Sequence, residues 1–251
     1  MRIATFNILS GRSPADDQVD EDRYRRAVRV IDADLLGLQE VDRNQPRSQH
    51  ADLTAIAAEE MGAVAHRFVA ALAGTPGTTW SAATGDEQPD SAAYGIAFLS
   101  RYDVVGWRVV RLPGAPVPIP HRFHGRRLPT WVRDEPRTAV VAEVATPGGR
   151  LDVVNTHLSF LRPWNLRQLR LLGAALEPRT RPLVLLGDLN MGPRPAARVT
   201  GMRPLARGAT FPAGAPREQL DHILATDDVG PARGTVLELP MSDHRALVAD
   251  L

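Results

Sequence analysis

The sequence predicts an α/β protein in which strand-rich sheets pack together and a few helices flank them. Apolar runs of strand length recur from one end of the 251-residue chain to the other, and three segments show helical periodicity. Hydrophobic residues make up 43% of the chain and charged residues 24%, as in a soluble domain with a sizeable core. Since no repeat or clear boundary is found, we expect one domain over residues 1–251.

Nine segments are predicted to form strands. Many of them alternate apolar and polar residues or are rich in β-branched side chains, as strands with one or two buried faces are. In chain order they are RIATFNI (2–8), DLLGLQEV (34–41), YGIAFLS (94–100), VVGWRVVRL (104–112), TAVVAEVA (138–145), LDVVNTHL (151–158), PLVLLGDLN (182–190), LDHILA (220–225) and RALVADL (245–251).

Three segments are predicted to form helices, because their apolar residues recur every three or four positions along one face. The helices cover residues 24–33, 52–62 and 165–177. Long segments rich in Pro and Gly are expected to be loops, and loops of this length are usually functional or disordered. These segments are 74–91, 113–136 and 191–218.

The net charge of +1 hides an uneven distribution of charge. Residues 1–61 hold 8 Arg against 12 Asp and Glu, whereas residues 161–217 hold 10 Arg against only Glu177 and Asp188. Such asymmetry can indicate an anionic partner. All 30 basic residues are Arg, which binds phosphate through two hydrogen bonds, although biased codon usage explains this composition more simply. The chain has no Cys, so any metal must be bound by oxygen or imidazole.

The sequence gives no sign of a membrane segment. It has no run of about 18 apolar residues. Its first residues, MRIATFNILS, resemble a strand and lack the apolar core and cleavage site of a signal peptide. We therefore expect a cytoplasmic protein, and no obligate protein partner is predicted.

Polar side chains follow the ends of four predicted strands, and others precede two later strands. Strands that run in opposite directions in an antiparallel sheet bring such groups to the same edge, so all of them can line one opening. At C-terminal ends these are Asn7, Glu40, Asn155 with His157, and Asp188 with Asn190; at N-terminal ends they are Asp221 with His222, and Asp243 with His244.

The first part of this set has the chemistry of a metal site. Glu40, Asn7 and Asp243 offer two carboxylates and a carboxamide, which are hard oxygen ligands suited to magnesium or manganese rather than zinc. His157 and His244 add imidazoles that can be cationic near neutral pH and could neutralise a phosphoryl group.

The second part of the set can activate water. Asp188 can deprotonate or orient a water molecule, and Asn190 can hold water and phosphate. Asp221 can orient His244, as a carboxylate orients a catalytic imidazole elsewhere. A metal, an activated water and a cationic group together predict phosphoester hydrolysis.

Each of these residues also has a structural explanation when taken alone. Asp188 and Asn190 suit a turn, because their side chains bond nearby backbone, and Asp243 suits a helix cap or a turn. His157 alone would more often be a structural histidine. His222 is interpreted as structural, because strand alternation directs it to the opposite face from Asp221.

The order of these motifs resembles that of the endonuclease/exonuclease/phosphatase superfamily, over nearly the whole chain. The resemblance implies a four-layer α/β sandwich, in which two mostly antiparallel sheets lie face to face between helices. It also implies hydrolysis of a phosphoester with magnesium or manganese. The motifs are ATFNIL, LLGLQEV, YGIAFLSR, VVNTHL, LLGDLN, LDHIL and SDHRAL.

The resemblance assigns roles to individual residues. Glu40 would be the metal ligand with Asn7 beside it, and Asp243 would assist the metal. Asp188 and Asn190 would activate water and position phosphate. His244 and Asp221 would form the dyad at the scissile phosphate, and His157 would be the second histidine of the deoxyribonuclease-like and sphingomyelinase-like branches. The weaker matches are Arg137 and Arg43, as substrate-contacting arginines, and Tyr94.

The substrate is less well defined than the chemistry. A phosphodiester, from nucleic acid or from a small molecule or lipid headgroup, is favoured over a phosphomonoester of a sugar or inositol. The acidic stretch 16–22 and the low net charge argue against a duplex-DNA nuclease. An inactive phosphate-binding module on the same scaffold is a further alternative. The 113–136 segment could contact any of these substrates through Arg122, Arg126, Arg127, Arg133, Phe123 and Trp131.

Overall fold

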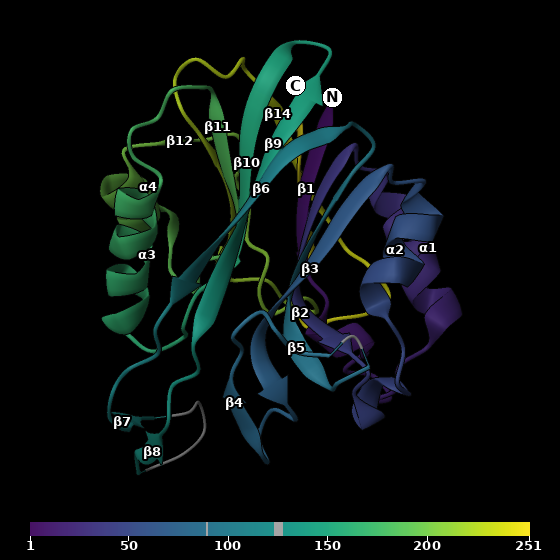
Figure 1. The fold of residues 1–251 in the computed structure, drawn as a ribbon, viewed down its shortest axis with the longest axis vertical. Helices are drawn as coiled ribbons and strands as arrows, with labels where there is room; N and C mark the ends of the chain where they lie inside the picture. Colours follow the sequence, from purple (N-terminus) through teal and green to yellow (C-terminus); the bar gives the residue numbers. More distant parts are fainter. Residues whose placement is uncertain (89, 123–127) are drawn as a thin grey trace.

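The computed structural model describes residues 1–88, 90–122 and 128–251, which form two large sheets with helices on their outer faces (Figure 1). In spatial order the first sheet contains β14 (Arg233–Leu237), β15 (Ala246–Asp250), β1 (Arg2–Asn7), β2 (Leu35–Arg43), β5 (Ala93–Ser100), β3 (Ala65–Gly74) and β4 (Trp80–Ala82). The second contains β12 (Arg203–Pro204), β13 (Asp221–Ala225), β11 (Leu183–Asp188), β10 (Gly149–His157), β9 (Arg137–Thr146) and β6 (Val104–Leu112).

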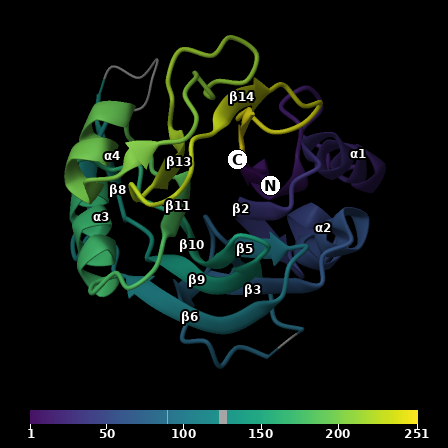
Figure 2. The ribbon, with the colours of Figure 1, turned by 90° about the horizontal axis from the view of Figure 1, so that it is seen from above.

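In the described part of the chain, four α-helices form the outer layers. Two of them cover the first sheet and two cover the second, with both sheets between them (Figure 2). A small hairpin of β7 (Ile119–His121) and β8 (Thr130–Val132) extends from the second sheet. The helices are α1 (Glu21–Ile31) and α2 (Leu53–Met61) on the first sheet, and α3 (Trp164–Ala175) and α4 (Pro193–Thr200) on the second.

The alternation of side chains along each strand explains how the layers pack together. In β1, Ile3 packs between the two sheets, whereas Ala4 and Phe6 face α1 and α2. The outer face of the second sheet packs Leu185 against Leu169 of α3. Burial of apolar side chains at three successive interfaces makes the molecule the four-layer α/β sandwich that the sequence predicts.

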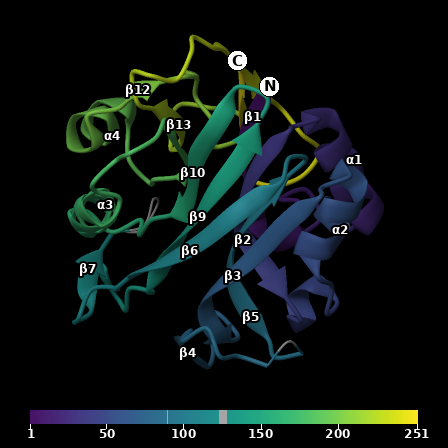
Figure 3. The same cartoon turned by 45° about the horizontal axis from the view of Figure 1, so that its top comes forward.

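The pairing of strands agrees with mostly antiparallel sheets. Only β1–β2 and β10–β11 are parallel among the pairings of described strands. The two termini lie side by side, where Arg2 pairs with Asp250 (Figure 3). Asn7 is at the other end of β1, so that end of the sandwich is where the polar strand ends gather.

All nine predicted strands and all three predicted helices are present, but the sequence prediction misses several elements. Strand β3, AHRFVAALAG, has no clear alternation, because four consecutive residues, 69–72, are buried. The three segments expected to be loops contain β4, the β7–β8 hairpin, and α4 with β12. Helix α4 begins at Pro193 and ends before Gly201, a common pattern of helix ends that the Pro and Gly content hides. Strand β14 is also missed, because its residues are largely exposed.

No helix among the described residues is both long enough and apolar enough to cross a membrane.

A buried polar network connects the two sheets next to the polar strand ends. Gln39 of β2 donates to Asn155 of β10 at 2.7 Å and bonds Thr5 of β1 at 3.0 Å. The Asn155 amide donates to the backbone carbonyls of Leu38 and Ala97, at 3.0 and 2.8 Å. Because an unpaired polar group is costly in this interior, these bonds fix one sheet relative to the other.

Replacement of Asn155 by Ala is expected to lower the free energy of unfolding by about 2–4 kcal/mol, because two buried carbonyls and the Gln39 amide each lose one hydrogen bond. Urea unfolding of wild type and variant measures this difference. The exposed substitution Gln88→Ala serves as the control and should change the free energy of unfolding little. A variant as stable as the wild type would show that the network does not hold the sheets together.

Candidate active site

The register of the strands brings the predicted site residues to one end of the sandwich. In the parallel pairs, Asn7 lies opposite Gln39, and His157 lies opposite Asp188. In the antiparallel pair β11–β13, Asp188 lies opposite Asp221. The turn that precedes β15 is tied to β1, because Ser242 Oγ donates to the carbonyl of Asn7 at 2.6 Å. Side chains far apart in the sequence therefore share one location.

A bulge in β2 directs Glu40 towards this group. The register of β2 shifts between Gln39 and Val41, and Glu40 between them has a left-handed backbone with φ of 54°. A non-glycine residue in this region is strained, and bulges commonly redirect a side chain at a functional site. The shift moves Glu40 out of the strand alternation and places its carboxylate at the end of the sheet.

Asn7 joins two carboxylates from different sheets. Its Nδ2 donates to Glu40 Oε1 at 3.1 Å and to Asp188 Oδ2 at 3.0 Å. Its Oδ1 accepts from the backbone N–H of Leu9 at 3.1 Å and therefore does not face Glu40. Asn7 and Asp188 are buried, whereas Glu40 remains partly exposed.

His244 and Asp221 form a short, buried pair beside Asp188. His244 Nδ1 lies 2.8 Å from Asp221 Oδ2, and Nε2 on the other side of the ring lies 3.8 Å from Asp188 Oδ2. The ring of Phe211 packs against the imidazole, with centroids 4.9 Å apart. Asp221 thus orients His244 so that its second nitrogen faces Asp188.

His157 contacts three other members of the group. Its Nε2 lies 3.5 Å from Asp188 Oδ2 and 3.2 Å from Asn190 Nδ2, and its Nδ1 lies 3.3 Å from Arg137 Nη1. Arg137 is also paired with Glu135 at 3.4 Å. Since both ring nitrogens face N–H donors, the surroundings favour the neutral imidazole.

Burial and neighbouring charges shift the pKa values of Asp188 and His244. Burial, with the charge of Asp221, raises the pKa of Asp188 to about 7, against the lowering effect of His244 and the bonds from Asn190 and Asn7. Burial alone would lower the pKa of His244, but Asp221, Asp188 and Asp243 together raise it to about 10. Asp188 can thus exchange a proton near neutral pH, while His244 stays cationic.

The pKa values of two other groups in the site are shifted as well. Burial raises the pKa of Glu40, and the charge of Asp243 adds to this effect, whereas the bond from Asn7 opposes it. Burial, with the charges of Arg137 and His244, lowers the pKa of His157 well below its usual value. The sequence interpretation allowed two cationic imidazoles, but only His244 is cationic near neutral pH.

Sequence reasoning missed Arg47. Its guanidinium binds the buried carboxylate of Asp42 through two bonds of 2.7 and 2.8 Å and lies 5.4 Å from the ring centroid of Tyr94. The charge of Glu40 contributes to raising the pKa of Arg47, which places this cation near the acidic group. Tyr94 is buried. Burial raises its pKa, the charge of Glu40 adds to this effect, and the charge of Arg137 opposes it. An acidic residue followed five positions later by Arg is too common a pattern to identify this pair.

Some predicted residues lie elsewhere or make fewer contacts. Arg43 packs over the ring of Phe68, 4.7 Å from its centroid, and lines a cavity with Arg67 and Arg111. Asp243 is partly exposed and acts on Glu40 and His244 through its charge. His222 contacts the carbonyl of Met191 at 2.8 Å on the face opposite Asp221, as its structural interpretation expects.

The arginine-rich segment 113–136 is described in part. Arg133 packs over the ring of Trp80 at 4.7 Å, and Trp131 is 71% exposed. Arg122 is exposed. The other three residues named for this segment, Phe123, Arg126 and Arg127, lie outside the described residues.

Among the described residues, Asp188, Asp221 and His244 form a group that could hold a metal ion, since their ligand atoms lie within 4.8 Å of one another. This spacing includes the short contact of His244 with Asp221. Glu40 and Asp243 offer additional carboxylate oxygens on the partly exposed side of the cluster.

A four-layer α/β sandwich with an acid–histidine group at one end of its sheets defines the class of this protein. A family model described as Endonuclease/Exonuclease/phosphatase family matches residues 4–244, and the chain belongs to this family. Its members are hydrolytic phosphoesterases that usually depend on divalent metal. A comparison with curated protein sequences gives no match.

Solved structures share the fold. An endonuclease/exonuclease/phosphatase from Beutenbergia cavernae DSM 12333 is 25% identical, with a TM-score of 0.71, over 99% of this chain and 70% of that chain. The mannosyl-6-phosphatase of Bacteroides thetaiotaomicron VPI-5482 is 15% identical, with a TM-score of 0.64, over 100% and 98% of the two chains. A truncated Caenorhabditis elegans TDP2 is 16% identical, with a TM-score of 0.61, over 99% and 96%.

Replacement of Asp188 by Asn is expected to raise the melting temperature of the metal-free protein. The pKa of Asp188 rises from 3.8 to about 7 on folding. The folded state therefore binds more protons than the unfolded state between about pH 4 and pH 7, and wild-type stability falls as pH rises through this range. Asn carries no charge, so the variant does not lose stability in this way. Its melting temperature should therefore exceed that of the wild type by about 3 °C or more at alkaline pH, and by less in acid.

Melting curves in a metal chelator at about pH 5 and about pH 8 test this expectation. The exposed substitution Asp86→Asn is the matched control and should leave the melting temperature nearly unchanged at both pH values. An Asp188→Asn protein that is no more stable than the wild type at the higher pH would contradict the raised pKa.

Proposed function

We propose that this chain is a divalent-metal-dependent phosphoester hydrolase that cleaves a phosphodiester by in-line attack of water. The observation that carries the proposal is the pair of bonds from Asn7 Nδ2 to Glu40 and Asp188, at 3.1 and 3.0 Å. These bonds join an acidic group suited to a cation with an acid–histidine group suited to proton transfer. Because both sheets supply these residues, we propose that residues 1–251 act as one catalytic domain.

Glu40 and Asp243 are proposed to bind magnesium or manganese, with Asn7 holding Glu40 in place. The side chain of Glu40 accepts one hydrogen bond from the described residues, and the charge of Asp243 raises its pKa, so two negative groups with free oxygen lone pairs lie together. Hard oxygen donors of this kind suit both ions. A bound cation would polarise the phosphorus–oxygen bond and lower the pKa of water.

The second group of three, Asp188, Asp221 and His244, is proposed to handle protons rather than metal. A histidine that binds a metal must be neutral, whereas Asp221, Asp188 and Asp243 together raise the pKa of His244 to about 10 against the effect of burial. Asp188, with a pKa of about 7, would take the proton of the attacking water, and Asn190 would help to hold that water.

Two cations are proposed to bind the phosphoryl oxygens. His244 presents its charged ring beside Asp188. Arg137 is buried, and its Nε has no hydrogen-bond partner among the described residues, so this donor is available to a ligand. His157 contacts both Arg137 and Asn190, and as a neutral imidazole it would accept a hydrogen bond from one of them and so help to position it. Cationic donors fixed before the reaction stabilise the charge that develops on phosphorus-bound oxygens.

A phosphomonoester is the second candidate substrate. Arg47, Arg137 and His244 all influence, or are influenced by, the charge of Glu40. Three cations suit a monoester, whose phosphoryl group carries close to two negative charges near neutral pH, better than a singly charged diester.

Turnover of bis(4-nitrophenyl) phosphate, a diester, and of 4-nitrophenyl phosphate, a monoester, tests the proposal. We expect hydrolysis of the diester with magnesium or manganese, slower hydrolysis of the monoester, and none in chelator. Faster turnover of the monoester would select the second candidate. Absence of turnover with either metal would favour an inactive binding module.

Variants test the residue roles in the same assay. Asp188→Ala and His244→Ala are each expected to lower kcat by about 10²–10⁴-fold, as the loss of a general base or a catalytic cation does. The exposed substitution His66→Ala is the matched control and should retain wild-type kcat. Circular dichroism checks that each variant is folded. Wild-type kcat in a folded Asp188→Ala or His244→Ala protein would refute the role assigned to that residue.

A further inference from the structure

Three arginines that line one cavity have no carboxylate partner among the described residues. Many arginines of the chain are paired with Asp or Glu, for example Arg2 with Asp250 at 2.8 Å. Within the described part of the chain, Arg43, Arg67 and Arg111 make no ion pair. All three line one cavity of about 120 Å³.

Aromatic rings and a backbone carbonyl hold these guanidinium groups in place. The Cζ atom of Arg43 lies 4.7 Å from the ring centroid of Phe68, and that of Arg67 lies 5.9 Å from the ring centroid of Trp107. Arg111 Nη1 donates to the carbonyl of Ala70 at 2.6 Å. Such contacts orient a cation but leave its charge uncompensated.

The cavity also contains an unsatisfied donor. Arg43 Nε is buried and has no hydrogen-bond partner among the described residues. Among the described residues, Glu87 is the one carboxylate that lines the cavity, and its oxygens accept hydrogen bonds from the backbone N–H of Gly85 at 3.0 and 3.2 Å. Three positive charges against one negative charge leave the cavity with a net charge of +2. Bringing like charges together is unfavourable unless an anion neutralises them.

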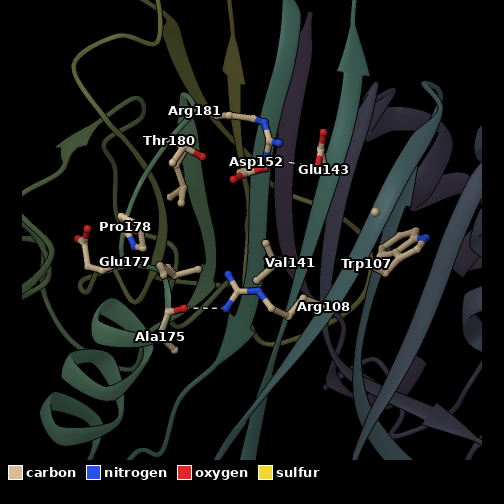
Figure 4. A pocket seen from close by; sticks show the side chains of 13 residues that line it. Trp107, Arg108, Val141, Glu143, Asp152, Ala175, Glu177, Pro178, Thr180 and Arg181 are labelled. Atoms are coloured by element: carbon tan, nitrogen blue, oxygen red, sulfur yellow. Dashed lines mark hydrogen bonds and ion pairs between the residues drawn. The ribbon is translucent and has the colours of Figure 1, made fainter.

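In a second cavity, by contrast, the arginines have partners. It has a volume of about 360 Å³ and lies between the second sheet and the end of α3 (Figure 4). There Arg181 is paired with Glu143 at 3.3 Å and with Asp152 at 3.6 Å, while Arg108 donates to the carbonyl of Ala175 at 2.6 Å. Its lining holds three carboxylates against two arginines, so it offers no site to an anion.

We propose that the cavity lined by Arg43, Arg67 and Arg111 binds a tetrahedral oxyanion, either inorganic phosphate or the phosphate group of a phosphorylated molecule. Guanidinium groups form paired hydrogen bonds to phosphate oxygens, and the small volume fits one such group rather than a large ligand. None of Asn7, Glu40, Asp188, His157, His244 and Arg137 lines this cavity, and two of its arginines come from β3 and β6, which lie side by side (Figures 1 and 3). The proposal does not depend on catalysis.

Calorimetric titration with inorganic phosphate in a metal chelator tests the site without any turnover. The double variant Arg67→Gln/Arg111→Gln is expected to bind phosphate at least tenfold more weakly than the wild type at this site. Both side chains are exposed, so the fold should tolerate the change. The matched control is Arg150→Gln/Arg181→Gln, which removes the same charge from ion-paired arginines and should stay within about twofold of the wild type.

A crystal soaked in selenate locates the ion. Density among Arg43, Arg67 and Arg111 supports the proposal, whereas density confined to Arg137 overturns it. Equal weakening in both double variants, or no wild-type binding at about 10 mM phosphate, also overturns it. Titration with adenosine monophosphate, a sugar phosphate and vesicles that contain phosphatidic acid then identifies the source of the group. Binding of inorganic phosphate alone would assign the site to the free ion.

Discussion

The contact of one carboxamide with two carboxylates is the interaction on which the candidate site depends. Asn7 ends β1, and its amide reaches Glu40 on the neighbouring strand and Asp188 on the opposite sheet. Such a contact exists only if the two sheets keep a fixed register, which the buried bonds among Thr5, Gln39 and Asn155 provide. The hydrophobic interfaces bring the sheets together, and this polar network determines how they align.

The buried charges of this arrangement destabilise the folded protein at the site where chemistry is proposed. Asp188 and Asp221 are buried carboxylates, and Glu40 adopts a strained backbone to join them. One cationic imidazole, His244, offsets part of the negative charge, and Arg137 offsets part of the rest. Asp188, whose pKa is raised to about 7, is thereby suited to proton transfer near neutral pH, at the expense of stability.

Much of the fold and the meeting of the strand ends could be predicted, because both follow from local patterns. Alternation identified the nine strands, and antiparallel direction implied that Asp221 would meet Asp188. What could not be predicted depends on long-range packing. Strand β3 is recognisable only from its neighbours, and Arg47 reaches the site because its loop folds back onto Asp42. The family resemblance assigned Arg43 to substrate contact, but nothing in the sequence indicates that its guanidinium packs on Phe68 and lines a cavity with Arg67 and Arg111.

The central claim is that Glu40 binds a divalent cation beside the proton-transferring group of Asp188, and metal binding measures it most directly. Calorimetric titration with manganese should show a site that Glu40→Gln weakens by at least tenfold, since the substitution removes a charged ligand while keeping the side-chain shape. The exposed substitution Glu238→Gln should leave the affinity unchanged. Equal manganese affinity in the wild type and the Glu40→Gln protein would contradict the account.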